Sequence, residues 1–105
     1  MKRGEIWWAE LEPPAGKRPV LLLSKDEAYA VRSLVIVAPV TTRIRGIAAE
    51  VPLTIEDGMP QACVVNLDLI TTIPKDCLRS RHAILTHIKL KEIEEAIHFA
   101  MGLDQ

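Results

Sequence analysis

The apolar residues of this chain come in short runs, and prolines, glycines and charged turns interrupt them. Runs at residues 6–9, 19–24, 34–41, 50–53, 62–65 and 67–73 predict strands, because they are brief and rich in β-branched side chains. The run at 34–41 does not alternate, which predicts a strand buried on both faces. The run at 67–73 is expected to stop at Pro74. Residues 25–32 are polar and predict a helical turn at most, and Asp57-Gly58 predicts a turn.

The spacing changes after Thr86, where apolar residues recur three and four positions apart through Ile93 and Ile97. Thr86 is a suitable N-cap, and Gly102 stands where a left-handed glycine ends a helix. We therefore expect one amphipathic helix at the end of a run of strands. This order predicts a single β-rich α+β domain over residues 1–105, built on a small curved barrel or sheet.

Composition excludes several classes of protein. No apolar run approaches the roughly 20 residues of a membrane helix, and the N-terminal segment lacks the apolar stretch of a signal peptide. We expect a soluble, cytoplasmic protein that does not bind a membrane. Cys63 and Cys77 form no CxxC pair and are expected to be buried, reduced thiols. The three histidines lack the spacing of a zinc site, so no metal is expected.

Charge is distributed unevenly. Residues 1–45 hold eight basic and five acidic side chains, a net charge of +3, whereas residues 46–105 hold five basic and nine acidic ones, a net charge of −4. Clustered Lys and Arg favour phosphate backbones through counterion release. The N-terminal half is therefore the candidate surface for nucleic acid.

Polar side chains stand at the ends of the predicted strands. No nucleophile elbow, Walker loop, zinc motif or dinucleotide fingerprint is present. If the strands are neighbours, a guanidinium, a hydroxyl and a carboxylate could converge at one rim. The candidates are Arg18, Thr41, Thr42, Arg43, Arg45, Asn66 and Asp68.

Six segments of the chain resemble the MazF/PemK (Kid) family of toxin–antitoxin ribonucleases. They are KRGEIWWAEL, GKRPVLLLS, VAPVTTRIRG, EVPLTIEDGMP, VVNLDLITTIPK and EEAIHFAMGL, in this order over nearly the full length. The resemblance implies a twisted SH3-like barrel with a C-terminal helix, usually a homodimer. It also implies a cognate antitoxin whose disordered tail occupies the RNA groove.

The reaction implied by the resemblance is a sequence-specific cleavage of single-stranded RNA, as in mRNA, without a metal or other cofactor. The 2′-hydroxyl of the substrate attacks the adjacent phosphorus and leaves a 2′,3′-cyclic phosphate and a 5′-hydroxyl. Arg18 matches the catalytic arginine and Thr41 the phosphate-contacting threonine, a role that Thr42 could share. Lys17, Arg43, Arg45 and Asn66 are candidate RNA contacts.

The chain departs from the family pattern at several positions. Asp68 matches the aspartate of a Kid-type acid–base pair, but Asn66 replaces its arginine, and an amide carries no proton at neutral pH. Asp68 is therefore either catalytic or a brace for Arg18 or a backbone N–H. The loop before Arg18 is short and stiffened by prolines, which predicts an open groove. Of the adjacent Trp7 and Trp8, one is expected in the core; the other could pack at an interface or stack on a base.

Two other functions stay open at this point. The same fold can carry a toxin that binds a protein target, as the CcdB-like gyrase poisons do. It can also carry an inactive RNA-binding barrel, an option that the Asn66 substitution supports.

Overall fold

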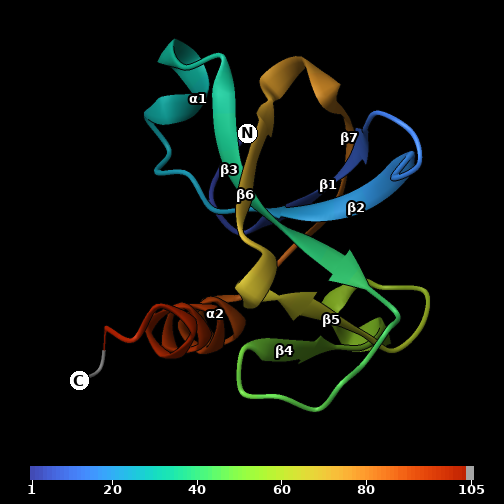
Figure 1. The fold of residues 1–105 in the computed structure, drawn as a ribbon, viewed down its shortest axis with the longest axis vertical. Helices are drawn as coiled ribbons and strands as arrows, with labels where there is room; N and C mark the ends of the chain where they lie inside the picture. Colours follow the sequence, from blue (N-terminus) through green and yellow to red (C-terminus); the bar gives the residue numbers. More distant parts are fainter. Residues whose placement is uncertain (104–105) are drawn as a thin grey trace.

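The structure, a computed structural model, describes residues 1–103 of the 105-residue chain (Figure 1). Seven strands, two α-helices and three 3-10 turns follow one another. They are β1 (Glu5–Glu10), β2 (Lys17–Leu22), α1 (Ala28–Val31), β3 (Leu34–Thr41), β4 (Glu50–Leu53), η1 (Ile55–Asp57), β5 (Cys63–Asn66), η2 (Leu67–Leu69), β6 (Thr71–Pro74), η3 (Lys75–Cys77), β7 (Leu78–Ile84) and α2 (His87–Met101).

The strands form one antiparallel sheet in the order β4-β5-β3-β2-β1-β7. Strand β3 is central: β2 pairs with one edge, while β6 and β5 pair in turn with the first and last parts of the other edge. Within residues 1–103 no ladder joins β4 to β7, so strand pairing leaves the twisted sheet open. The β-rich α+β class is confirmed, with the barrel curved rather than closed.

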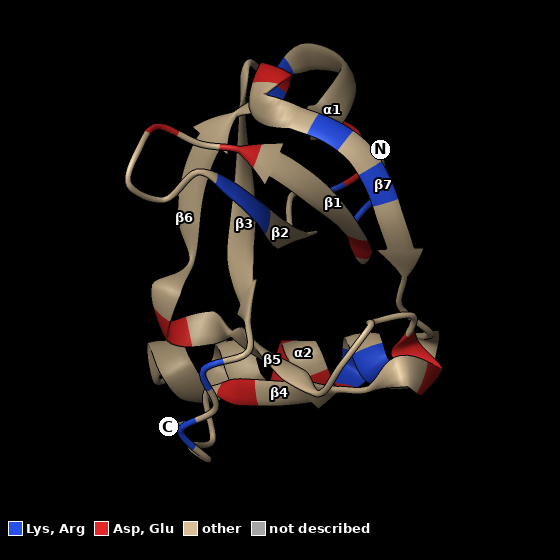
Figure 2. Cartoon of the chain, turned by 90° about the vertical axis from the view of Figure 1, so that its right-hand side faces the viewer, with Lys and Arg blue, Asp and Glu red and all other residues tan. Residues whose placement is uncertain are grey.

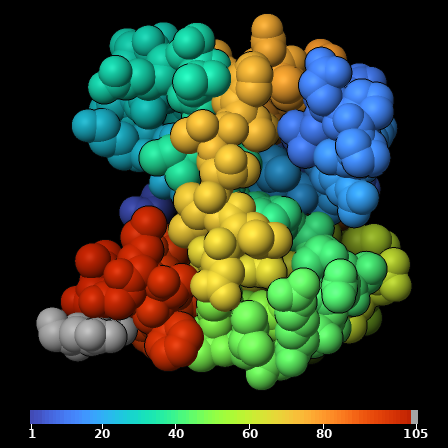
Figure 3. Space-filling view, viewed as in Figure 1, coloured from blue at the N-terminus to red at the C-terminus, as the bar shows by residue number. Residues whose placement is uncertain are grey.

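Two apolar cores lie on opposite faces of the shared strands. In β2, Leu21 belongs to a core that includes Ile93 of α2, whereas Val20 and Leu22 belong to a core that includes Tyr29 of α1. Successive side chains of a strand point to opposite faces, so one strand serves both cores. In the space-filling view, the yellow segment of η2 and β6 runs between the α1 region and the red α2 (Figure 3).

Helix α2 begins and ends as the sequence predicts. The Thr86 hydroxyl accepts a hydrogen bond from the Lys89 N–H at 3.2 Å, and Gly102 closes the helix at φ +69°. The helix packs close to the N-terminus, because a Cβ on Gly4 would come within 2.8 Å of Leu90. Gly4 also has φ +96°, so both space and backbone conformation call for glycine there.

Three expectations about the strands are corrected. Residues 67–73 do not form one strand, because the Asn66 side chain accepts the Asp68 N–H at 3.0 Å and turns residues 67–69 into η2. Strand β6 then begins at Thr71 and includes Pro74. Strand β3 is not buried on both faces throughout, since Leu34 and Ile36 are 55% and 43% exposed. The edge strand β7 was not expected. The predicted turn at Asp57-Gly58 and the helical turn within 25–32 are confirmed.

Helix α2, the longer of the two helices, has only 15 residues. No helix in the described part of the chain combines the length and apolarity that a membrane span requires.

Candidate nucleic-acid site

Two surface hollows meet at the strand ends where the sequence places its candidate residues. The first, named the Trp8 hollow, has a volume of about 390 Å³ and is lined by Trp8, Ala15, Lys17, Arg18, Pro19, Val40, Thr41, Thr42, Met59, Pro60, Gln61 and Cys63. The second, named the Asn66 hollow, has about 290 Å³ and is lined by Leu11, Ala15, Arg18, Val20, Pro39, Val40, Thr41, Arg43, Arg45, Asn66 and Leu69. Arg18 and Thr41 line both, so their junction is the centre of the site.

Arg18 is placed by the antiparallel pairing of β1 and β2, in which it lies opposite Ala9. Its side chain is exposed, and its Nε donates a hydrogen bond of 2.7 Å to the carbonyl oxygen of Ala15. Among residues 1–103 its two terminal nitrogens have no hydrogen-bond partner. This one contact orients the guanidinium and leaves its outer donors available for a phosphate.

Thr41 is the last residue of β3 and Thr42 follows it, and the two side chains have different surroundings. Thr41 pairs with Val64 of β5, is half-buried and lines both hollows, whereas Thr42 is exposed and lines only the Trp8 hollow. The Thr41 hydroxyl accepts a hydrogen bond from the backbone N–H of Arg43 at 3.1 Å. Its own O–H can still be donated to a phosphate oxygen beside Arg18.

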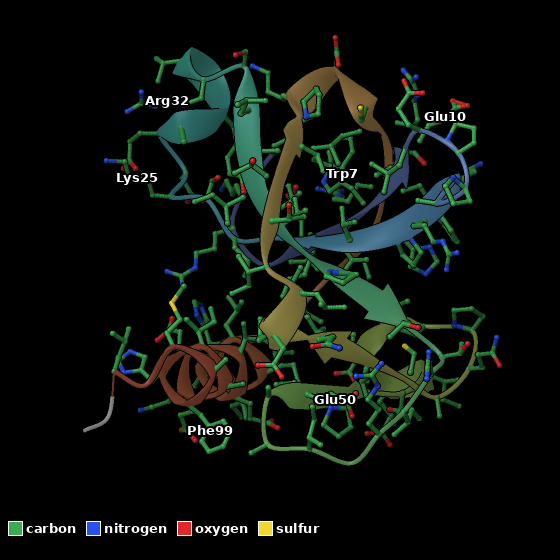
Figure 4. The ribbon with its side chains drawn as sticks, in the orientation of Figure 1. Trp7, Glu10, Lys25, Arg32, Glu50 and Phe99 are labelled. Atoms are coloured by element: carbon green, nitrogen blue, oxygen red, sulfur yellow. The ribbon has the colours of Figure 1, made fainter. Side chains whose placement is uncertain are left out.

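A buried carboxylate holds the connection that carries Arg43 and Arg45. Glu50 is 8% exposed, lies opposite Asn66 in the β4–β5 ladder, and accepts backbone N–H bonds from Arg45 at 3.0 Å and Gly46 at 2.9 Å. It lies on β4, below the β3–β5 pair (Figure 4). The two arginine side chains are exposed at the Asn66 hollow. Glu50 thereby fixes the turn between β3 and β4, and the Arg43 and Arg45 side chains of this turn face the site.

Asn66 and Asp68 do not face the same space. Asn66 is buried and lines the Asn66 hollow, but Asp68 is exposed on η2 and lines neither hollow. The Asp68 carboxylate makes no hydrogen bond or ion pair within residues 1–103, so no brace to Arg18 or to a backbone N–H is formed. The convergence at the rim therefore consists of a guanidinium, a hydroxyl and an amide, rather than the expected carboxylate.

The two tryptophans have different surroundings. Trp7 packs on the core that includes Tyr29, and its Nε1 donates to Glu5 at 2.8 Å (Figure 4). Trp8 lines the hollow, where the ring of His82 meets it edge-on with centroids 5.8 Å apart. His82 is in turn fixed by the Gly58 carbonyl oxygen, 3.0 Å from its Nε2.

Lys17 places its Nζ 5.7 Å from the centre of the Trp8 ring. A contact of this kind at an exposed site contributes about 0.5–1 kcal/mol. Stacking of a base contributes about 1–3 kcal/mol. A base that stacks on this face of the Trp8 ring can therefore displace the Lys17 side chain.

Neither cysteine forms a disulfide, as expected. Cys63 is buried at the floor of the Trp8 hollow, and burial raises the pKa of its thiol, which keeps it protonated and unreactive. Cys77 is only half-buried, so the expectation of a buried thiol is wrong for this residue. The described residues contain no group of three or more His, Cys, Asp and Glu side chains that could hold a metal ion.

Gln61 and His82 were not among the candidates from sequence, and Trp8 was one only as a member of the Trp7-Trp8 pair. Gln61 lies 53 positions beyond Trp8 and just outside the family-like segment that ends at Pro60. They meet because the η1–β5 connection folds back toward the start of β2. The pair of adjacent tryptophans was the only signal, and it did not tell which of the two faces the site.

An open, twisted β-domain with Arg18, Arg43, Arg45 and Thr41 around an exposed rim belongs to the class of proteins whose surface is suited to a phosphodiester. Over residues 2–101 the chain matches the family described as PemK-like, MazF-like toxin of type II toxin–antitoxin system, and it belongs to this family.

Relatives and solved structures agree with this assignment. The chain is 39% identical over 104 residues to a probable endoribonuclease MazF2 of Mycobacterium tuberculosis, covering 97% of this chain and 99% of the relative. The structure of Mycobacterium tuberculosis toxin MazF-mt6 superimposes with a TM-score of 0.88 at 36% identity, covering 96% and 99% of the two chains. A mycobacterial endoribonuclease in complex with its cognate antitoxin gives a TM-score of 0.86 at 26% identity, covering 98% and 96%.

Proposed function

We propose that this chain, an endoribonuclease toxin of a type II toxin–antitoxin module, cuts single-stranded RNA at the junction of Arg18 and Thr41. The reaction needs no metal, and the 2′-hydroxyl of the substrate attacks the neighbouring phosphorus. The products are a 2′,3′-cyclic phosphate and a 5′-hydroxyl end. Because the nucleophile belongs to the RNA, the site does not require a nucleophilic side chain.

The observation that carries this proposal is the position of Arg18 and Thr41 at the boundary shared by both hollows. An RNA strand that occupies both hollows passes its phosphodiester over these two side chains. The guanidinium stays charged and presents a planar set of donors, so it suits the extra negative charge of a phosphorane. The threonine hydroxyl adds a further donor at the same phosphate.

A catalytic role for Asp68 requires its exposed carboxylate to reach the junction when RNA binds. The variant Asp68→Asn tests this requirement. Loss of cleavage with unchanged RNA binding would add Asp68 to the catalytic groups, and full activity would restrict it to the η2 turn.

The principal test is incubation of the purified protein with a long single-stranded RNA in excess chelator, followed by mapping of the cut sites and end groups. We expect cyclic phosphate and 5′-hydroxyl ends, and a loss of about 10²–10³ in rate for Arg18→Ala, the cost of removing one oxyanion donor. Arg32→Ala is the matched control, because this exposed arginine lies beyond α1, away from the site (Figure 4).

Four outcomes would contradict the proposal. Cleavage that the chelator abolishes would show a metal-dependent reaction. An unchanged rate in Arg18→Ala would remove the central residue. Binding of RNA without any product would select the inactive barrel, and toxicity without RNA cleavage would select a protein-binding toxin.

The partners follow from the same assignment. We propose that this chain binds a cognate antitoxin, as the mycobacterial endoribonuclease does. We also propose that an extended segment of the antitoxin blocks the hollows. We further propose that the chain acts in the cytoplasm as a homodimer. Competition between an antitoxin peptide and RNA for binding to the wild-type protein would test the first point. The mass of the protein in solution would test the homodimer.

A further inference from the structure

We infer that the Trp8 hollow is a nucleobase subsite, which holds the base of one nucleotide next to the cleaved phosphodiester and reads its edge with Gln61. This inference rests on the proposed function, because it places the phosphate at Arg18 and Thr41. It adds the part of the site that selects a sequence.

The first step is the shape of the site. Both hollows share Arg18 and Thr41, so a nucleotide whose phosphate lies there has its base directed to one side or the other. The Trp8 hollow, of about 390 Å³, lies within the range of about 300–1,000 Å³ that is usual for small-ligand sites. Its floor is apolar, since Met59 and Cys63 are 5% and 4% exposed there.

The second step is the aromatic wall. Bases of single-stranded RNA are recognised by stacking on aromatic rings and by hydrogen bonds to their edges. Trp8 is held in place by β1 pairing with Pro19 and Ser80, and by the edge contact of His82. The flexible side chain of Lys17 lies over its ring, and this lysine can move to a phosphate.

The third step is the amide of Gln61. Gln61 is exposed at the hollow, and among residues 1–103 its side chain has no hydrogen-bond partner. An amide offers both a donor and an acceptor, which is the pattern that distinguishes base edges. Asn66 in the other hollow is less available, because its Oδ1 already accepts the Asp68 N–H.

The experiment compares cut sites in a pool of single-stranded RNA with every base at each position, for wild type, Gln61→Ala and Gln61→Glu. Wild type should prefer one base at a position adjoining the cut, and Gln61→Ala should reduce this preference about 5- to 150-fold. The glutamate of Gln61→Glu offers only hydrogen-bond acceptors. It should shift the preference toward cytosine, because a carboxylate accepts a hydrogen bond from the cytosine amino group. Ser33→Ala, an exposed polar position between α1 and β3, is the matched control and should cut like wild type.

An unchanged base preference at every position around the cut in both Gln61 variants would overturn the inference, even if Arg18→Ala cuts as slowly as proposed. A general loss of rate with the preference retained would also overturn it, since that is the effect of a structural role. Should no protein cut RNA, the proposed function fails by itself. The RNA molecules that bind to wild type and to Gln61→Ala would then be sequenced. A base preference that wild type shows and Gln61→Ala lacks would support the subsite, and the same preference in both would overturn it.

Discussion

Thr41 is the residue whose role the geometry defines most narrowly. Its hydroxyl lies at the junction of both hollows, whereas its methyl group and backbone complete β3. We expect Thr41→Val to keep the fold and to lower kcat by about 10- to 100-fold, because a hydrogen bond to a charged phosphate is lost. Thr41→Ser should retain most of the activity. Single-turnover cleavage of a short RNA would measure both, and equal rates for Val and Ser would exclude the hydroxyl from the reaction.

Glu5 makes the stability of the protein depend on pH. Burial alone raises the pKa of its carboxyl, but hydrogen bonds from the Trp7 indole and the Lys2 N–H, the N-terminal charge and Arg81 together hold it below the ordinary glutamate value. A lowered pKa in the folded state stabilises the fold above the unfolded value of about 4.3. That stabilisation is lost as the pH falls through the folded pKa.

We therefore expect Glu5→Gln to lower the free energy of unfolding at pH 7 by about 1–3 kcal/mol. The difference from wild type should shrink below about pH 4. Urea unfolding at both pH values measures the effect. Glu10→Gln is the control on the same strand, since its ion pair with Arg79 is exposed and contributes little. A difference that is constant with pH would contradict the assignment to Glu5.

Which site residues the sequence could predict depended on whether the pairing of neighbouring strands alone brings them together. Arg18 and Thr41 stand at strand ends, and antiparallel pairing of β2 with β3 brings such ends together, so their meeting was foreseeable. The different orientations of Asn66 and Asp68 were not foreseeable. Residues two apart on a strand point to the same face, but here a 3-10 turn begins after Asn66 and directs Asp68 elsewhere. Gln61 reaches Trp8 only through tertiary folding.

At the scale of elements, the connection of β3 to β4 depends on one carboxylate. Glu50 accepts the N–H groups of Arg45 and Gly46, and so fixes a turn that has no regular structure of its own. We expect Glu50→Gln to raise KM more than it lowers kcat, because the cations of this turn lose their position while Arg18 keeps its own.

Steady-state kinetics on a single-site RNA, with urea unfolding alongside, would measure this split. Glu95→Gln on the exposed face of α2 is the control. A fall in kcat with KM unchanged would show that Glu50 acts on the reacting centre instead.

The elements differ in how well local sequence specifies them. Helix α2 carries its own cap, period and terminal glycine, so it was predicted correctly. Strand β7 has an exposed middle with Arg79 and Arg81, and such a polar edge gives no apolar period. Its position is decided by pairing with β1, with two irregularities in register that no local pattern reports.

At the scale of the whole molecule, the position of the basic residues matters more for RNA binding than the net charge. The net charge is −1, yet the basic start of β2 and the basic β3–β4 connection lie on the same side of the molecule (Figure 2). Arg18, Arg43 and Arg45 line one hollow there, with Lys17 in the adjacent one. A chain without net positive charge can therefore still bind a polyanion at one place.

This arrangement predicts the salt dependence of RNA binding. In the slowly cleaving Arg18→Ala protein, Lys17, Arg43 and Arg45 remain near the phosphates, and each single-strand contact contributes about 0.7 to the slope of log affinity against log salt. We expect a slope of about −2, falling to about −0.7 when Arg43 and Arg45 are also replaced by alanine. Anisotropy of a labelled single-stranded RNA measures it. The control is the double variant Lys25→Ala and Arg32→Ala, which removes the same charge near α1 (Figure 4) and should keep the original slope. An equal fall of the slope in this control would mean that the RNA is attracted by the total charge of the protein and is not held at the site.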